Sequence, residues 1–314
     1  MATSATASAA VRAAFTQLID YAGLFPPAKL DMAAALAEYA AARRGPYAWM
    51  LGRFIVPASR IAQLTAAVPA VEPLPLSVIV DAGSDPLAWL SRVQQILGDV
   101  SALRGAGQRV RVESLEIALT PLPRERDTYD APIGQFAAAL KQAGLNDLPA
   151  FVEIPRDDRW NSELESALFA LERHKLGAKL RCGGVVPEAF PGANDVAMFI
   201  RAAIAQHRLP MKATAGLHHP IRHFDHRLGV PMNGFLNLLA AAAFARAGMD
   251  QSGVLGIVAC EDPHHFQFSE HGLEWEGEHV HVDDLQATRS QCFISYGSCS
   301  FSEPTSDLHE LGIL

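Results

Sequence analysis

The chain has 314 residues, with 26 basic and 34 acidic side chains and a formal net charge of −8. This balance, without a Lys/Arg cluster, argues against a nucleic-acid partner. Hydrophobic residues make up 49% and charged residues 19% of the chain, which predicts a large folded core and argues against disorder. The longest apolar stretch, 238–245, is far shorter than the roughly 18 residues of a membrane span. We therefore expect a soluble protein with a small-molecule substrate and no membrane partner.

The four cysteines are scattered and form no Cys-x-x-Cys pair, which argues against a disulfide framework. The Ala-rich N-terminus lacks the long apolar core of a signal peptide. These two observations predict a cytoplasmic protein.

Strand and helix patterns alternate along the chain. Two amphipathic helices are predicted first, over about 7–20 and 31–44. Eight strands are predicted at 49–56, 76–80, 110–119, 150–154, 178–182, 211–215, 254–259 and 293–297. The helices that follow them are predicted to open at Ser59 and to span 87–97, 132–143, 161–175, 193–207, 233–247 and 303–311.

Eight strands alternating with helices predict a (β/α)₈ TIM barrel, which leaves no open sheet edge. The rival is a doubly wound open sheet, but no Gly-x-Gly-x-x-Gly follows the first strand. We expect one domain over 1–314, with a helical N-terminal segment at 1–45 and an inserted hairpin at 260–281 after the seventh strand. The turn at 20–27 would plug the bottom of the barrel or fold over its mouth. The apolar helix at 235–247 would pack in the outer ring or form a homo-oligomer contact.

Two lysines interrupt apolar strands: Lys179 within the fifth and Lys212 within the sixth. A buried ammonium without a partner costs several kcal/mol, so both lysines are candidates for chemistry. Side chains two residues apart face the same side of a strand. Arg181 therefore joins Lys179 on one face, and the same alternation turns Glu116 and Glu153 of the third and fourth strands toward the barrel interior.

Lysines beside carboxylates suggest imine chemistry. A lysine that loses its proton through burial and a neighbouring cation can attack a carbonyl to form a Schiff base, with a glutamate moving protons. The alternative is a structural network of Lys–Glu ion pairs inside the barrel. Both interpretations place Glu116, Glu153, Lys179 and Lys212 together.

The order Glu116, Glu153, Lys179, Lys212, with Lys179-Leu-Arg-Cys-Gly and Lys212-Ala-Thr-Ala-Gly, locally resembles class I aldolase barrels of the deoxyribose-phosphate aldolase kind. The resemblance covers only these short strands. It implies that one strand lysine forms the imine, that the lysine of the next strand tunes it, and that an acidic residue handles protons. Arg181 and Cys182 replace the small hydroxyl residues of that family, which shifts our preference toward Lys212 as the reactive amine.

Histidines follow two predicted strands. His218 and His219 come after the sixth strand, and His264 and His265 follow the seventh. These imidazoles would contact an anionic substrate or act as general acids. We expect no resident metal cofactor, but a divalent metal is the alternative, with His218, His219, His264 and Glu261 as ligands.

Three further residues, Ser298, Ser300 and Arg53, are candidate contacts for an anion. Ser298 and Ser300 lie where the eighth strand enters a helix, and helix N-termini bind anions; the alternative is an ordinary capped turn. Arg53 is the single charge in the first strand and would be an interior anion clamp or a strand-end salt bridge.

These patterns predict an enzyme acting on a small anionic carbonyl compound by lyase, aldolase-like or isomerase chemistry. Lys212 or Lys179 would be the nucleophile or base, and Glu153 and Glu116 the acid–base partners. Arg181 would bind the anion. The alternatives are a metal-dependent hydrolase or lyase built on the histidine loops, and a non-catalytic ligand-binding barrel.

Overall fold

The computed structural model describes residues 7–68, 73–105, 109–119, 129–156 and 160–314. Eight strands form a closed barrel in which every neighbouring pair is parallel, in the order β1-β13-β7-β6-β5-β4-β3-β2. Their bounds are β1 Ile19–Tyr21, β2 Leu51–Pro57, β3 Leu74–Ile79, β4 Val110–Ala118, β5 Ala150–Glu153, β6 Gly177–Arg181, β7 Met211–Thr214 and β13 Phe293–Ser298. The predicted (β/α)₈ barrel is confirmed.

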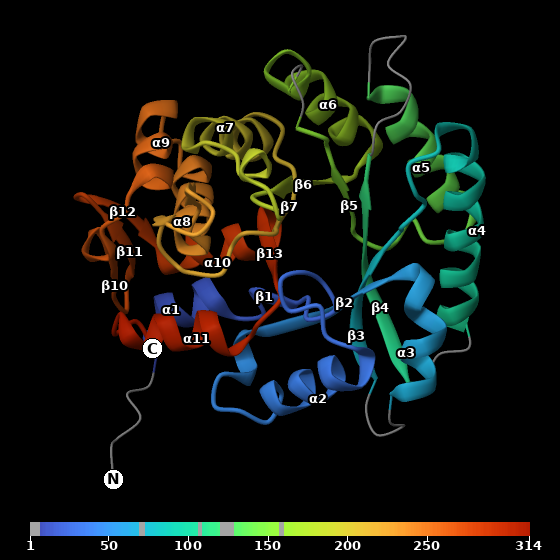
Figure 1. The fold of residues 1–314 in the computed structure, drawn as a ribbon. Helices are drawn as coiled ribbons and strands as arrows, with labels where there is room; N and C mark the ends of the chain where they lie inside the picture. The colour runs from blue at the N-terminus through green and yellow to red at the C-terminus, as the bar shows by residue number, and fades with distance from the viewer. Residues whose placement is uncertain (1–6, 69–72, 106–108, 120–128, 157–159) are drawn as a thin grey trace.

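Helices surround the barrel (Figure 1). Those that match predicted helices are α1 Ala9–Phe15, α2 Met32–Ala42, α3 Ile61–Ala67, α4 Pro86–Gly105, α5 Asp130–Gln142, α6 Trp160–His174, α7 Ala193–Ile200, α8 Phe235–Arg246 and α11 Ser302–Glu310. No helix in the described ranges is long and apolar enough to cross a membrane.

The first barrel strand is β1, which the sequence patterns assigned to the end of the first helix. Helix α1 stops at Phe15, and the chain passes through Gln17, whose φ is +50°, before entering Ile19–Tyr21. A three-residue strand buried at every position shows no alternation, so periodicity could not detect it. The predicted turn at 20–27 therefore begins inside the barrel wall.

The prediction of a strand at 254–259 is wrong. These residues belong to helix α9, Gln251–Ala259, which Asp250 caps by accepting a hydrogen bond from the Gly253 N–H. The helix packs against α8 and α7 on the outside of the barrel (Figure 1). A short apolar run fits a buried helix face as well as a buried strand.

The insertion between β7 and β13 is larger than the predicted hairpin. It contains the two-stranded sheet of β8 (His223–Asp225) and β9 (Val230–Met232), then α8, α9 and a three-stranded antiparallel sheet. The sheet consists of β10 (Phe266–Phe268), β11 (Gly272–Trp275) and β12 (Glu278–His281), and α10 (Val282–Gln291) leads back to the barrel. Helix α8 is buried from Phe235 to Ala245 because these elements cover its outer face.

Candidate functional site

The two strand lysines lie side by side in the barrel interior. Lys179 on β6 and Lys212 on β7 are register partners, as strand alternation predicts. Their side chains are 6% and 1% exposed. Both are therefore buried charges, which are tolerated only when ion pairs and hydrogen bonds compensate for lost hydration.

Glu116 on β4 bridges the two ammonium groups. Its Oε2 lies 2.9 Å from Lys179 Nζ, and its Oε1 forms an ion pair with Lys212 Nζ. Ser77 of β3 donates a hydrogen bond of 2.5 Å to the same Oε1. Glu116 reaches this position because Leu115 and Ile117 point outward into the hydrophobic core, as predicted. One carboxylate thus forms ion pairs with two buried cations.

Burial opposes ionisation of Glu116, but Lys179 and Lys212 outweigh it, and with hydrogen bonds from Lys212 and Ser77 they hold its pKa well below the ordinary range. Burial also acts against the charged form of Lys179. Attraction to Glu116 and Glu153 outweighs that effect and raises the Lys179 pKa. At neutral pH the centre therefore holds a carboxylate and a Lys179 ammonium, which differs from the neutral amine that imine chemistry requires.

Asp20 of β1 is the main interior residue that the sequence patterns missed. It is fully buried, and its Oδ2 lies 2.8 Å from Lys212 Nζ and accepts a 2.7 Å hydrogen bond from Ser295. Its Oδ1 accepts a 2.7 Å hydrogen bond from the Arg53 backbone N–H. The signal was present in the sequence, because Asp20 interrupts the apolar run Leu18-Ile-Asp-Tyr21 just as the lysines interrupt theirs.

Ser77 and Ser114 complete the polar surroundings of Lys212. Lys212 Nζ donates a 3.1 Å hydrogen bond to Ser77 Oγ, and Ser114 Oγ donates one of 2.8 Å to the same oxygen. An ammonium has three hydrogens. Asp20, Glu116 and Ser77 account for all three on Lys212, whereas Lys179 has two partners, Glu116 and Glu153, within the described residues.

Glu153 and Arg181 connect this cluster to the open end of the barrel. They are the last residues of β5 and β6, and active sites of TIM barrels lie at this carboxyl end. Glu153 Oε2 lies 3.2 Å from Lys179 Nζ, and Glu153 Oε1 lies 3.4 Å from Arg181 Nη1. The Arg181 side chain is 52% exposed, compared with 10% for Glu153. Exposure therefore increases from Lys212 through Lys179 and Glu153 to Arg181.

The loops that follow the two lysine strands pack tightly against each other. A Cβ on Gly183 would lie 2.8 Å from Gly216 Cα, and Gly216 itself has a φ of +67°. Ala215, directly after β7, has a φ of +61°, which is unusual for a residue with a Cβ. The glycines after each lysine are thus required by close backbone approach and by a left-handed turn.

Gly52 makes room for the Asp20 carboxylate, which gives a testable prediction. A Cβ at this position would lie 2.3 Å from Asp20 Oδ1. Gly52→Ala should displace Asp20 from Lys212 and lower the free energy of unfolding by about 1–3 kcal/mol in urea denaturation. Gly98→Ala is the control, because nothing lies within 4 Å of the added Cβ in that helix. Equal unfolding free energies for Gly52→Ala and wild type would contradict this contact.

Arg53 is held by acidic side chains. Its Nε lies 3.1 Å from Glu113 Oε2 and its Nη1 lies 3.7 Å from Asp20 Oδ1. These contacts match the salt-bridge alternative, and they leave Arg53 bound to two carboxylates.

His218 and His219, in the loop after β7, contact helix α11. His218 Nδ1 lies 3.1 Å from Glu303 Oε2, and His219 Nδ1 lies 2.6 Å from Asp307 Oδ2. Cys299 Sγ approaches the same His218 nitrogen at 3.8 Å. Thiol and carboxylate therefore share one ring nitrogen and do not form a relay across the imidazole.

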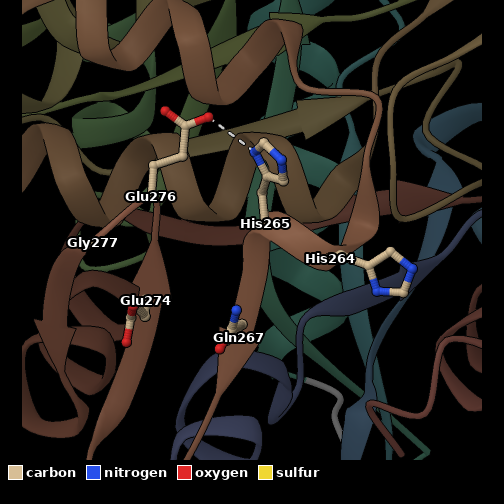
Figure 2. A pocket seen from close by; sticks show the side chains of 6 residues that line it. All are labelled: His264, His265, Gln267, Glu274, Glu276 and Gly277. Carbon is tan, nitrogen blue, oxygen red and sulfur yellow. Dashed lines mark ion pairs between the residues drawn. The ribbon is translucent and has the colours of Figure 1, made fainter.

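His264 and Glu261 do not follow a barrel strand, contrary to expectation. They follow α9, which packs outside the barrel. His264 and His265 line a small pocket beside β10 and β11, where His265 Nδ1 lies 3.0 Å from Glu276 Oε1 and His264 projects in another direction (Figure 2). Glu261 Oε1 lies 3.8 Å from Arg222 Nε. Among the described residues, no group of three or more His, Cys, Asp or Glu side chains could hold a metal ion.

Ser298 and Ser300 form the turn between β13 and α11. Ser298 Oγ donates a 2.6 Å hydrogen bond to the Ser300 carbonyl, and Ser300 Oγ accepts one of 3.1 Å from the Glu303 N–H. These are the contacts of a capped turn. Glu303 in the first turn of α11 adds a negative charge where an anion would bind.

Comparisons with known proteins add no family. No protein-family model matches the chain, and no curated protein or solved structure matches it significantly. The barrel and its interior ion cluster are therefore the basis for any functional assignment.

Proposed function

We propose that the protein is an enzyme that acts on a small anionic carbonyl compound by isomerase or lyase chemistry. Glu153 would move a proton at the carbon next to the carbonyl, and the Lys179 ammonium would bind the carbonyl oxygen. The observation that carries this proposal is the Lys179–Glu153 pair, a buried cation and a carboxylate 3.2 Å apart at the carboxyl end of the barrel strands.

Glu153 would act as the base, and Lys179 would stabilise the enolate that forms. Glu153 takes a proton from the carbon beside the carbonyl, and the electrons of that C–H bond form the new carbon–carbon double bond. The carbonyl electrons move onto oxygen, where a Lys179 N–H stabilises the developing enolate. In an isomerisation of an α-hydroxy carbonyl compound, the hydroxyl proton moves to the enolate oxygen and Glu153 returns its proton to the former carbonyl carbon, which leaves the carbonyl group on the neighbouring carbon. In a lyase reaction Glu153 takes the proton of a β-hydroxyl group, the carbon–carbon bond breaks to give a new carbonyl group and the enolate, and Glu153 returns that proton to the enolate carbon.

The contacts favour Lys179 over Lys212 as the reacting group, which reverses the preference drawn from sequence. All three hydrogens of Lys212 are directed to Asp20, Glu116 and Ser77. Within the described residues Lys179 has two partners, Glu116 and Glu153, and Glu153 in turn contacts the exposed Arg181. We assign Lys212 a positioning role: it neutralises Glu116 and holds it against Lys179.

A second candidate function is imine-forming lyase chemistry at Lys179. Glu153 lies close enough to receive the ammonium proton, which would free the amine to attack a carbonyl. The raised pKa of Lys179, caused by Glu116 and Glu153 in opposition to burial, makes this route less favourable than ammonium catalysis.

The proposal is tested by incubating the protein in D₂O with small anionic carbonyl compounds that carry an exchangeable proton, such as pyruvate, 2-oxobutyrate and dihydroxyacetone phosphate. We expect protein-dependent loss of the adjacent C–H signal in the proton NMR spectrum of at least one compound, and no loss with Glu153→Gln. Borohydride reduction followed by intact-mass analysis separates the two candidates. A reduced adduct that disappears in Lys179→Met would favour the imine route, whereas exchange without an adduct supports ammonium catalysis.

Exchange that persists at the wild-type rate in both Glu153→Gln and Lys179→Met would contradict both routes. Glu113→Gln is a matched control, because Glu113 lies on β4 in ion pairs with Arg53 and Arg111 and is partly exposed. This variant should retain exchange.

A further inference from the structure

Arg181 is the exposed member of the interior ion cluster. Its guanidinium lies 3.4 Å from Glu153 Oε1, while the other oxygen of Glu153 is paired with the buried Lys179. Half of the Arg181 side chain is exposed, so this ion pair is in contact with solvent and is weak. An incoming anion reaches Arg181 before it reaches the buried groups.

We propose that the anionic group of the substrate draws Arg181 away from Glu153, and that this displacement frees Glu153 Oε1 to accept the substrate proton only when substrate is bound. The inference rests on the proposed function and adds a coupling between binding and proton abstraction. The substrate class is a carbonyl compound whose carboxylate or phosphate binds a guanidinium. Guanidinium groups bind such oxyanions through two parallel hydrogen bonds.

The charges around Glu153 determine what this displacement does. Lys179 and Arg181 on β6 are its cationic neighbours, and Glu116 on β4 shares Lys179 with it. The buried Cys182 thiol is also close, and burial together with Glu153 raises its pKa, so it remains uncharged. Arg181 contacts Oε1 of Glu153 and Lys179 contacts Oε2, so removal of Arg181 leaves Oε1 available to accept a proton.

Arg181 can move because 52% of its side chain is exposed, and among the described residues Glu153 is its one ion-pair partner. Lys179 has no such freedom, because it is buried between Glu116 and Glu153. An anion therefore removes one cation from Glu153 and leaves the other in place.

The test is NMR of the carboxyl carbons at one fixed pH in protein labelled with ¹³Cδ-glutamate, in which Glu153→Gln identifies the Glu153 signal. Sulfate is the anion probe, and chloride at equal ionic strength is the reference. In the wild type, sulfate should shift the Glu153 signal, because the Arg181 contact is lost. In Arg181→Gln the signal should already be shifted in chloride, and sulfate should add nothing.

Arg227→Gln is the control, since Arg227 is highly exposed and pairs with Asp225 in the hairpin outside the barrel. It should behave as the wild type. A Glu153 signal that sulfate leaves unchanged in the wild type, or that shifts equally in Arg181→Gln, would overturn the inference. Neither result depends on turnover, so failure here is distinct from failure of the exchange experiment.

Discussion

Glu116→Gln is expected to lower the free energy of unfolding by about 3–5 kcal/mol, because it removes the carboxylate that is paired with both buried ammonium groups. Glu116 contacts both Lys179 and Lys212, and the side chains of these lysines are almost fully buried. The measurement is urea denaturation followed by circular dichroism, with the native spectrum as the check that the variant folds.

The effect should depend on pH. The pKa of Glu116 is lowered from its ordinary value of 4.5 by Lys179 and Lys212, against the effect of burial. Its contribution to stability is therefore fully present above about pH 4.5 and is lost as the pH falls toward the folded-state pKa. Glutamine does not titrate, so the difference in unfolding free energy between wild type and Glu116→Gln should shrink in acid.

Glu113→Gln provides the matched comparison on the same strand. Its ion pairs with Arg53 and Arg111 are partly exposed, so this change should cost about 1 kcal/mol or less. If Glu116→Gln unfolded at the same urea concentration as Glu113→Gln, the interior cluster would not be the coupled ion network described above.

Glu153→Gln is expected to lower the rate of carbon–hydrogen exchange by about 10²–10⁴-fold, the usual contribution of a general base. Lys179→Met should have an effect of similar size, because the methionine has no N–H to stabilise the enolate. The measurement is the initial rate of deuterium incorporation into the compound that the wild type exchanges fastest.

The double variant Glu153→Gln/Lys179→Met separates a joint role from two independent ones. Residues that act on one transition state are strongly non-additive, so the double variant should lose little more than either single variant. Fully multiplicative losses would show that the two side chains serve different steps, and a Glu153→Gln rate within a few-fold of wild type would remove Glu153 as the base.

Most of the charged residues in the barrel interior could be predicted because they interrupt apolar strands. Each strand has an apolar face that must pack against helices, so the alternation of side chains in β4, β5 and β6 correctly predicted that Glu116, Glu153, Lys179 and Arg181 lie on the opposite face. The closed barrel followed from the alternation of strands and helices.

The site residues that could not be predicted from the sequence were missed for physical reasons. β1 is too short to show a period, so Asp20 was assigned to a helix and turn although it is the second carboxylate on Lys212. Ser77 and Ser295 are small and uncharged, and nothing in their strands marks them as ligands of that cluster. Such contacts depend on which strands become neighbours, which sequence patterns do not specify.

The expected position of His264 was wrong because it depended on the element that precedes it. A strand at 254–259 would place His264 beside His218 at the mouth of the barrel. Instead His264 lies between α9 and β10. The sheet of β10, β11 and β12 lies outside the barrel (Figure 1). The wrong assignment of this one element therefore gave wrong expected positions for the candidate metal ligands His264 and Glu261.

The most direct measurement is a crystal structure of the wild-type protein soaked with the compound that it exchanges fastest. We predict the carbonyl oxygen within about 3 Å of Lys179 Nζ, the reacting carbon beside Glu153, and the anionic group bound to Arg181. A compound bound outside the barrel, with the contacts of Lys179 to Glu116 and Glu153 unchanged, would contradict the proposed site.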